Sequence, residues 1–319
     1  MPAVNSKIIQ ADYNDIRNKI VAVLGDGSAN FGYGQQARIN SVAVAEGNKV
    51  TINEWANLRL DIINAYKHIN GVNPITAQVA ENNTIRYTSS FTPDTGTLDA
   101  PQNQYDVWAN DITTNRFTVA GGESATTAAI SASRTGSWST QCSCTVTFSF
   151  LSANDARYWF NSGGKIRISA ARSGGAGTAQ NTSWTNLLSA AGTQNFGGAV
   201  PNTGTVPNDG TNWYKTTNTF QTFYTATSSS PYGSNNFRLQ ARCVDVPSNS
   251  GGTAVSGEIR VLFTDGYTDP GPPAPGDDID GTLTVNVSTL FAANSIMVPS
   301  SAVFTVVQPT VAIGAVTGS

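Results

Sequence analysis

The apolar residues near the start of the chain recur at the spacing of an amphipathic helix. In the stretch ADYNDIRNKIVAVLGDG they fall every three or four positions, so they share one helix face. Gly25 follows the last of them, where a glycine in the left-handed conformation commonly ends a helix. The pattern predicts a helix whose apolar stripe consists of Ile16, Ile20, Val23 and Leu24.

A second helix is predicted in TINEWANLRLDIINAYKHING. Thr51 and Glu54 have the spacing of a capping box, and Gly71 follows the last apolar position. Both apolar stripes are narrow, as in a helical pair, a small bundle or a subunit interface. We therefore expect residues 1–75 to form a helical attachment region that contacts another subunit or a larger particle. The predicted interface residues are Ile16, Ile20, Leu24, Trp55, Leu58, Ile62, Tyr66 and Ile69.

The rest of the chain is predicted to be mainly β structure. Residues 76–103 carry one short alternating run, TIRYT, and are interpreted as a connector. Beyond them, short runs of alternating apolar and polar residues predict strands with one buried face. These runs are RFTVAG, AISASR, CTVTFSFL, KIRISAAR, TFQTFYTAT, FRLQARCV, EIRVLFTD, TLTVNVSTL and AVFTVVQ. The predicted fold is an antiparallel β-sandwich of jelly-roll-like type over residues 104–319, with the N-terminal helices appended.

The segment SANDARYWFNSGGKIRIS contains a Gly-Gly-Lys of the kind found in phosphate-binding loops. Such a loop needs a strand, then glycines, then a helix, so that the helix N-terminal amides meet the phosphate. Here a helical pattern precedes the glycines and an alternating pattern follows them. We therefore predict a helix begun by Ser152 or Asn154 and ended by Gly163. The strand after it directs Ile166 and Ile168 inward and its lysine toward water.

Composition narrows the classes of partner. Only 12% of the 319 residues are charged and the net charge is −3, against about 25% charged residues in an average soluble protein. Because nucleic-acid binding normally needs a basic stripe, no nucleic-acid partner is expected. No apolar run reaches the roughly 20 residues of a membrane span, so no membrane insertion is expected. The start, MPAVNSKIIQADYND, lacks a signal-peptide pattern, whereas the weakly charged, Ser/Thr/Gly-rich composition suits a surface exposed outside a cell.

Few residues of the sequence are candidates for catalysis, disulfide bonding or metal binding. Cys142 and Cys144 share a strand face and cannot readily bridge each other; either pairs with Cys243, or all three are small buried residues. The only histidine, His68, lies beside the second helical stripe, so a Ser-His-Asp arrangement has a single candidate base. Three cysteines and one distant histidine lack the spacing of a zinc site.

An acidic cluster, DGYTDPGPPAPGDDIDG, raises the question of calcium. Its intervening PGPPAP is extended and rigid, and the cluster does not match an EF-hand loop, so a solvated loop is the favoured interpretation. We therefore predict no metal, no cofactor, no catalytic residue and no enzymatic activity. The acidic residues concerned are Asp265, Asp269, Asp277, Asp278 and Asp280.

The block LSANDARYWFNSGGKIRISAARSGGAGTAQNTSWTNLLSAAGTQNFGG resembles a pattern in virion structural proteins of tailed bacteriophages, notably those that infect cyanobacteria. In that pattern an Ala-Arg-aromatic-Phe-Asn-Gly-Gly segment precedes an alternating strand and a Trp-x-x-Leu-Leu helix. The opening ADYNDIRNKIVAVLGDGSANFGYGQ is similar to the N-terminal segment of such proteins. The matching residues are Ala156, Arg157, Tyr158, Trp159, Phe160, Asn161, Gly163 and Gly164, then Trp184, Leu187 and Leu188.

The resemblance implies a non-enzymatic structural protein of a virion, assembled in the host cytoplasm and exposed after lysis. It is compatible with the tail, the neck or collar, a fibre or the baseplate, and it brings no catalytic residues. By analogy with phage fibres we expect a homo-oligomer, with a trimer favoured, in contact with other virion proteins. The alternatives are a carbohydrate-binding adhesin that recognises a host-surface glycan, a head decoration protein, and a depolymerase with dispersed carboxylates.

Overall fold

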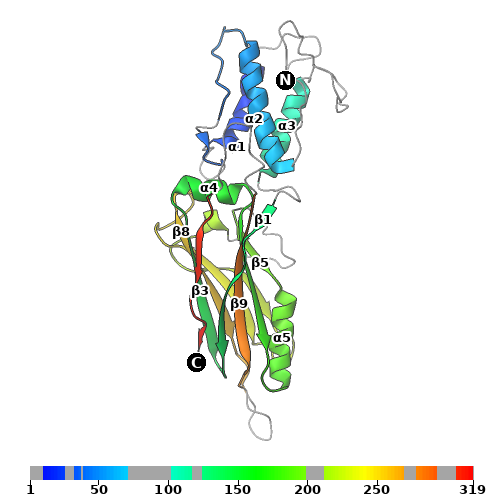
Figure 1. Cartoon of the computed structure of the whole chain (residues 1–319), viewed down its shortest axis with the longest axis vertical. Helices are drawn as coiled ribbons and strands as arrows, with labels where there is room; N and C mark the ends of the chain where they lie inside the picture. The colour runs from blue at the N-terminus through cyan, green and yellow to red at the C-terminus, as the bar shows by residue number, and fades with distance from the viewer. Residues whose placement is uncertain are drawn as a thin grey trace. The chain divides into compact units, whose positions relative to one another are not determined.

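The chain forms two compact units, a helical unit and a β unit (Figure 1). The computed structural model describes residues 10–25, 32–36, 39–70, 102–116, 124–198, 212–268, 278–292 and 307–318. The helical unit draws its described residues from the chain up to Ala125, from Arg157–Gly163 and from the end of the last long strand. The β unit contains the remaining described residues. The predicted connector, residues 76–103, lies almost wholly outside the described residues.

Three helices build the helical unit: α1 (Gln10–Leu24), α2 (Ile52–Asn70) and α3 (Gln102–Asn115). The predictions of α1 and α2 are confirmed, and each of the three helices contacts the other two. Gly25 ends α1 and donates its backbone N–H to the carbonyl of Val21 at 2.8 Å. Thr51 and Glu54 form the predicted capping box, because each side chain accepts a hydrogen bond from the other residue's backbone N–H.

The helix α3 is not predicted by the sequence pattern. It spans residue 104, where the β domain is predicted to begin, and its sequence QNQYDVWANDITTN is rich in residues of low helix propensity. Tyr105, Ala109 and Ile112 nevertheless recur at helical spacing, and all three are fully buried. Packing against α1 and α2 therefore stabilises a helix that its local sequence favours only weakly.

A buried carboxylate fixes the chain between α1 and α2. Asp61 of α2 is fully buried, and it accepts hydrogen bonds from the backbone N–H groups of Asn40 at 2.9 Å and Ser41 at 2.8 Å. A buried carboxylate without such donors would be strongly destabilising. Asp61 therefore holds the segment that precedes α2 against that helix.

The β unit contains two antiparallel sheets. The five-stranded sheet has the order β1-β9-β4-β5, with β2 also paired to β9; its strands are β1 (Ser124–Thr126), β2 (Ile130–Thr135), β4 (Lys165–Ser173), β5 (Gln194–Gly197) and β9 (Thr282–Ala292). The six-stranded sheet has the order β10-β3-β8-β7-β6, with β11 also paired to β3; its strands are β3 (Gln141–Ser149), β6 (Gln221–Thr227), β7 (Asn236–Cys243), β8 (Ser256–Thr264), β10 (Thr310–Ile313) and β11 (Thr317–Gly318).

Seven of the nine predicted strands are confirmed as β2, β3, β4, β6, β7, β8 and β9. The other two, RFTVAG and AVFTVVQ, lie mostly outside the described residues. The sequence pattern does not predict β1, β5, β10 and β11, because runs of two to four residues are too short for alternation to be recognised.

Aromatic side chains fill the space between the two sheets. Phe196 of β5 lies 6.3 Å from Phe148 of β3 and 5.1 Å from Phe223 of β6, measured between ring centroids. Offset and edge-on aromatic pairs of this kind stabilise a core beyond the area that they bury. The apolar faces of the two sheets therefore meet in one core.

Within the β unit, the helix α5 (Ala179–Ala191) lies alongside the sheets and contacts β4 and β6 (Figure 1). Thr178 caps its start, because the side chain accepts a hydrogen bond from the backbone N–H of Asn181. Trp184 is fully buried and lies 5.0 Å from Trp138 and 6.3 Å from Phe263 between ring centroids. The Trp-x-x-Leu-Leu segment is thus a helix, as the resemblance implies.

We predict that Gly257→Ala destabilises the β unit by about 1–3 kcal/mol, the usual effect of overpacking a core. A Cβ atom at Gly257 would lie 2.4 Å from the ring of Phe148 and 2.9 Å from the ring of Trp213. Gly177→Ala is the matched control, since a Cβ atom there meets nothing within 4 Å. Urea denaturation followed by tryptophan fluorescence measures both variants, and equal stability of the two would contradict the prediction.

Candidate functional site

The residues predicted to form an interface lie in the helical unit, and all of them except Tyr66 are buried within the chain. The prediction rests on a stripe that is long for two helices to bury between them. The third helix accounts for the difference: Tyr105 of α3 lies 5.7 Å from Trp55 between ring centroids, and Trp108 of α3 lies 6.2 Å from Tyr66. The apolar stripes therefore form the core of a three-helix unit. The residues concerned are Ile16, Ile20, Leu24, Trp55, Leu58, Ile62, Tyr66 and Ile69.

An ion pair joins α1 to α3 inside the helical unit. Lys19 donates a hydrogen bond to the buried carboxylate of Asp106, and its ammonium group also lies 3.3 Å from Asp15. Burial opposes the charge of Lys19, but the hydrogen bond and the attraction of Asp106 outweigh it, so the pKa of Lys19 is raised. This group of charges therefore acts in the structure as a link between two helices.

The Gly-Gly-Lys segment has the predicted order of helix, glycines and strand. The helix α4 (Ala153–Asn161) begins after Ser152, whose hydroxyl accepts a hydrogen bond from the N–H of Asp155 at 3.1 Å. Gly163 has a φ of +95°, and β4 begins at Lys165. A phosphate loop requires the opposite order. The segment therefore lacks the geometry of a phosphate-binding loop.

Two details of this segment differ from the prediction. Lys165 is half-buried instead of facing water, and burial together with the charge of Arg167 lowers its pKa. Residues 157–163 group with the helical unit, because Asn161 donates a hydrogen bond to the carbonyl of Gly32 at 2.6 Å and the ring of Tyr158 lies 5.7 Å from that of Tyr33. Residues 157–163 thus belong to the helical unit, whereas the sequence-based prediction places this helix over the sheets.

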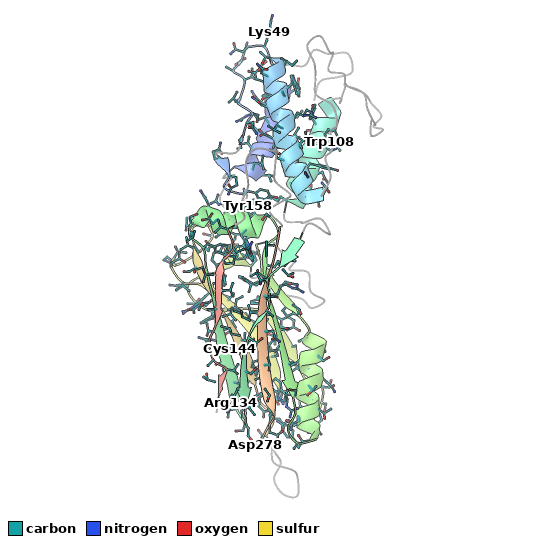
Figure 2. All side chains as sticks on the ribbon, in the orientation of Figure 1. Lys49, Trp108, Arg134, Cys144, Tyr158 and Asp278 are labelled. Carbon is teal, nitrogen blue, oxygen red and sulfur yellow. The ribbon has the colours of Figure 1, made fainter. Side chains whose placement is uncertain are left out.

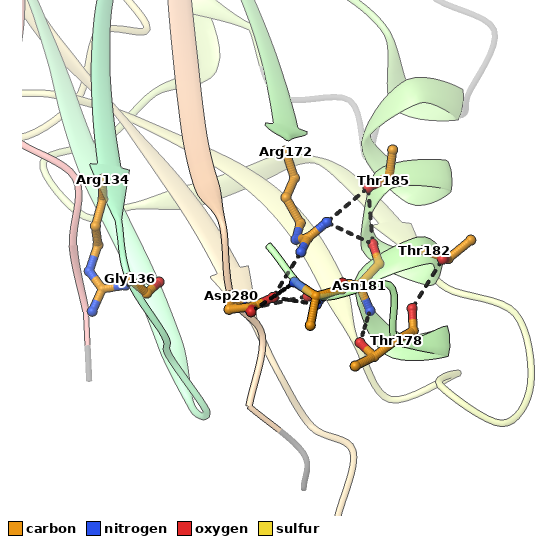
Figure 3. Close-up of polar contacts among 9 residues, drawn as sticks. Arg134, Gly136, Arg172, Thr178, Asn181, Thr182, Thr185 and Asp280 are labelled. Atoms are coloured by element: carbon orange, nitrogen blue, oxygen red, sulfur yellow. Dashed lines mark hydrogen bonds and ion pairs between the residues drawn. The ribbon is translucent and has the colours of Figure 1, made fainter. Parts of the chain in front are cut away.

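A polar cluster at one end of the β unit centres on Asp280 (Figure 3). We call Arg172, Ala176, Asn181 and Asp280 the Asp280 cluster. The carboxylate of Asp280 accepts hydrogen bonds from Arg172 at 3.2 Å, from the N–H of Ala176 at 2.9 Å, and from the side chain of Asn181. These partners lie on β4, on the turn after it and on α5, so one carboxylate joins three segments to the start of β9.

The charge of Asp280 is stabilised by its partners. The N–H of Ala176, the side chain of Asn181 and the charge of Arg172 together hold the pKa of Asp280 below its ordinary value of 3.8. Arg172 itself is only 6% exposed, which makes its carboxylate partner necessary because an unpaired buried charge is strongly destabilising. Gly175 allows the turn after β4 to approach the carboxylate of Asp280 closely, since a Cβ atom at this glycine would lie 2.3 Å from Asp280.

The predicted acidic cluster does not come together as one site within the described residues. Asp265 is buried and accepts hydrogen bonds from the side chain of Gln180 at 2.9 and 3.0 Å, whereas Asp280 belongs to the cluster just described. Asp278 is exposed at the end of the β unit (Figure 2). Asp269 and Asp277 lie outside the described residues. Among the residues described, no three metal-ligating side chains form a group that could hold a metal ion.

The three cysteines are buried and free of disulfide bonds. Cys142 and Cys144 share the inner face of β3, as their spacing predicts, and Cys144 lies among the strands of the β unit (Figure 2). Burial raises the pKa of Cys144 to about 12, which disfavours the reactive thiolate. His68 lies in α2, and its side chain is outside the described residues.

Sequence reasoning missed a charged group on the outer face of the six-stranded sheet. Arg242 and Arg260 both lie over the ring of Phe220, at 4.6 and 3.9 Å from its centroid. The alternation in FRLQARCV and EIRVLFTD signals that these arginines point outward. Only the register of β7 and β8, which sets Gln240 opposite Arg260 and Arg242 opposite Glu258, shows that they are neighbours.

Comparison with known proteins finds no matching family model, no matching curated protein and no matching solved structure. In the part of the chain that the structure describes, no helix is both long enough and apolar enough to cross a membrane. Functional inference therefore rests on the residues and their geometry.

We predict that Phe160→Ala lowers the free energy of unfolding by about 3–5 kcal/mol, because it deletes a buried aromatic side chain. Phe160 is 1% exposed and packs on Trp159 with ring centroids 4.8 Å apart. Lys165→Ala removes a half-buried lysine and should cause a smaller loss. Thermal melts with and without ATP measure both variants. An ATP-dependent rise in the wild-type melting temperature that Lys165→Ala abolishes would contradict our interpretation of the glycines.

We predict that Asp280→Asn destabilises the β unit near neutral pH but not in strong acid. The pKa of Asp280 is depressed on folding, so its contribution is complete above the ordinary carboxyl pKa of 3.8 and is lost as the pH falls through the lower folded-state value. The difference in melting temperature between wild type and variant should therefore shrink below that range. Asp278→Asn, two residues away and exposed, is the control. A difference that does not change with pH would refute the assignment.

Proposed function

We propose that the chain is a non-enzymatic structural component of the virion of a tailed bacteriophage, placed in the tail, the neck or collar, or a fibre. In this proposal the helical unit attaches the protein to other virion proteins, and the β unit is exposed. The observation that supports it most is the division into a helical unit and a β unit, each with its own core. The helical unit comes mostly from the N-terminal part of the chain and the β unit from the part that follows, which is the order that the resemblance implies.

The outer face of the five-stranded sheet supports an exposed role. Its β2 and β9 carry paired short polar side chains: Ser131 donates to Asn286 at 2.7 Å, and two further hydroxyl pairs lie 2.9 Å apart. Short side chains lose little conformational entropy on being held, and paired hydroxyls supply polarity without charge. Such a surface suits a durable protein that is exposed to the medium after lysis.

The acidic side chains support the non-enzymatic part of the proposal. Asp61, Asp265 and Asp280 each accept hydrogen bonds that hold a loop or turn in place. Asp245 accepts from the N–H groups of Val255 and Ser256 at the start of β8. Carboxylates that act as acid and base in glycoside hydrolysis must instead face each other across a substrate groove.

We further propose that the two sheets form a β-sandwich of jelly-roll-like type and that the protein is a homo-oligomer, with a trimer favoured. The chain crosses between the sheets repeatedly: from β2 to β3, from β3 to β4, from β5 to β6, from β8 to β9, and from β9 to β10. Crossing of this kind is typical of jelly rolls, in which neighbouring strands of one sheet are not consecutive in sequence. Here that holds for β10-β3-β8 and for β9-β4, whereas β6, β7 and β8 are consecutive neighbours. The trimer is inferred from the analogy with phage fibres.

Attachment through the helical unit requires apolar side chains that remain exposed. Among the described residues of this unit, the large apolar ones with substantial exposure are Val42, Ile52 and Val107, at 59%, 38% and 46%. Since the helical stripes are internal, these three replace them as candidate contacts with the particle.

We predict that the chain co-purifies with virions and that antibodies against the β unit label the tail or neck in electron micrographs. Replacing Val42 and Val107 together by Asp should sharply reduce incorporation, because a charge in a desolvated contact is unfavourable. Ile130→Asp, which alters a 38% exposed residue of the β unit, should leave incorporation unchanged. Quantitative mass spectrometry of purified particles measures the incorporation of the wild type and of both variants.

Absence of the chain from purified virions would refute the proposal. Labelling of the capsid would favour the alternative of a head decoration protein, and binding of host glycan by the β unit would favour the adhesin. Release of reducing ends from host envelope polysaccharide by the purified protein would contradict the non-enzymatic part and support a depolymerase.

A further inference from the structure

The outer face of the six-stranded sheet concentrates positive charge on β7 and β8. Along both strands buried residues alternate with half-exposed ones, so the half-exposed side chains share the face turned away from the core. The register places Arg242 opposite Glu258 and Gln240 opposite Arg260. We call this group the Arg260 face. It consists of Phe220, Arg238, Gln240, Arg242, Glu258 and Arg260.

The Arg260 face is positive in a chain whose net charge is −3. Its one carboxylate, Glu258, is held by Arg242, whose Nε and Nη2 atoms lie 2.8 and 2.6 Å from the same oxygen. Within the described part of the chain, Arg260 has no ion pair. The acid at the end of β7, Asp245, is engaged by the backbone of Val255 and Ser256. Arg238, whose described polar contact is the amide oxygen of Asn236, also has no ion pair in the described part of the chain, so this surface leaves the charges of Arg238 and Arg260 uncompensated.

Phe220 holds the guanidinium of Arg260 in place. The ring centroid lies 3.9 Å from the central guanidinium carbon, a cation–π contact that restrains the side chain without using its N–H groups. The planar guanidinium keeps its donors, whose fork geometry matches a carboxylate. Because the side chain is already restrained, less conformational entropy is lost when a ligand binds. Arg260 is thus preorganised to accept an anion.

The residues opposite Arg260 on the two neighbouring strands are polar. Gln240 and Thr145 lie opposite it on the two neighbouring strands, and the Gln240 amide donates to the hydroxyl of Thr222 at 3.2 Å. Val244, directly after β7, is 47% exposed, but the rows of the described sheet that hold Gln240, Arg260 and Thr145 contain no large apolar side chain with substantial exposure. Hydroxyls and amides suit the hydroxyl groups of sugars, whereas an acidic peptide would normally be anchored by apolar side chains as well.

We propose that the Arg260 face binds an acidic polysaccharide, with Arg260 pairing to a uronic-acid carboxylate and Gln240 and Thr145 contacting sugar hydroxyls. Arg238, diagonal to Arg260 in the register, supplies a second cation for a neighbouring carboxylate of the same polymer. This binding activity goes beyond the structural role proposed above and does not depend on it. Incorporation into virions and polysaccharide binding are measured in separate experiments, so one proposal can be refuted while the other is supported.

The test uses the full chain and immobilised polygalacturonate, with dextran as the neutral polysaccharide, in biolayer interferometry. Arg260→Gln should lower the affinity for polygalacturonate by at least about tenfold, the usual effect of losing a charged hydrogen-bonded pair. Arg134→Gln is the matched control, because it removes the same charge from the other sheet, where Arg134 contacts the carbonyl of Gly136 (Figure 3). It should leave the affinity nearly unchanged.

Two further variants separate binding from a structural role. Glu258→Gln frees Arg242 and removes the only carboxylate of the Arg260 face, so it should raise the affinity even though it breaks an ion pair. Phe220→Leu should lower the affinity by about two- to fivefold through loss of the cation–π contact. Circular dichroism and thermal melts check that the variants fold. If Arg260→Gln does not fold, Arg260→Lys is the alternative. It keeps the positive charge but lacks the paired N–H donors of the guanidinium group, so it should still lower the affinity.

Three results would overturn the proposal. The first is that the wild type binds polygalacturonate no better than dextran. The second is that Arg260→Gln and Arg134→Gln lose affinity equally, which would indicate a general effect of charge. The third is equal, Arg260-dependent binding of poly-glutamate or duplex DNA, which would assign the face to a different class of partner. A higher affinity of Glu258→Gln, together with a loss of affinity in Arg260→Gln but not in Arg134→Gln, would support it.

Discussion

The β unit depends on aromatic rings packed between its two sheets. Hydroxyl and amide groups on β2 and β9, and guanidinium and amide groups on β7 and β8, lie on the outer faces. Water solvates such groups as well as the protein does, so they contribute little to holding the two sheets together. Phe148 and Trp213, with ring centroids 5.4 Å apart, approach the backbone of β8 closely because Gly257 has no side chain. Phe196 extends the same ring contacts to the five-stranded sheet. Burial of this surface is therefore what makes the polar exterior possible.

Only 12% of the residues are charged, and several of the charged side chains form ion pairs that connect two secondary-structure elements. Lys19 and Asp106 join two helices, and Arg172 and Asp280 join β4 to the start of β9. Each of these pairs includes a side chain that is almost wholly buried, where removal of one partner would leave an unpaired charge. Arg260 differs from these residues because its only described contact is an aromatic ring. That difference, not the number of arginines, makes its surroundings a candidate binding surface.

The two proposals concern different parts of the molecule. A structural role needs attachment, and the burial of the helical stripes moves the candidate contacts to exposed residues such as Val42 and Val107. A binding role needs a preorganised polar surface, which the six-stranded sheet provides around Phe220. A protein that is both anchored and exposed can carry both roles, because anchoring and recognition use separate surfaces.

The sequence by itself determined the features that depend on near neighbours along the chain: the helices α1, α2 and α4, the capping box at Thr51, the glycine that ends α4, and the alternation of the long strands. It did not reveal α3, because the helix propensity of that segment is low and its stability comes from partners far away in sequence. It also left open what would cover the predicted stripe of Trp55 and Leu58, and which residues would surround Arg260. Periodicity shows which face of an element is apolar. Only the tertiary structure, through α3 and the register of β7 on β8, decided what each face meets.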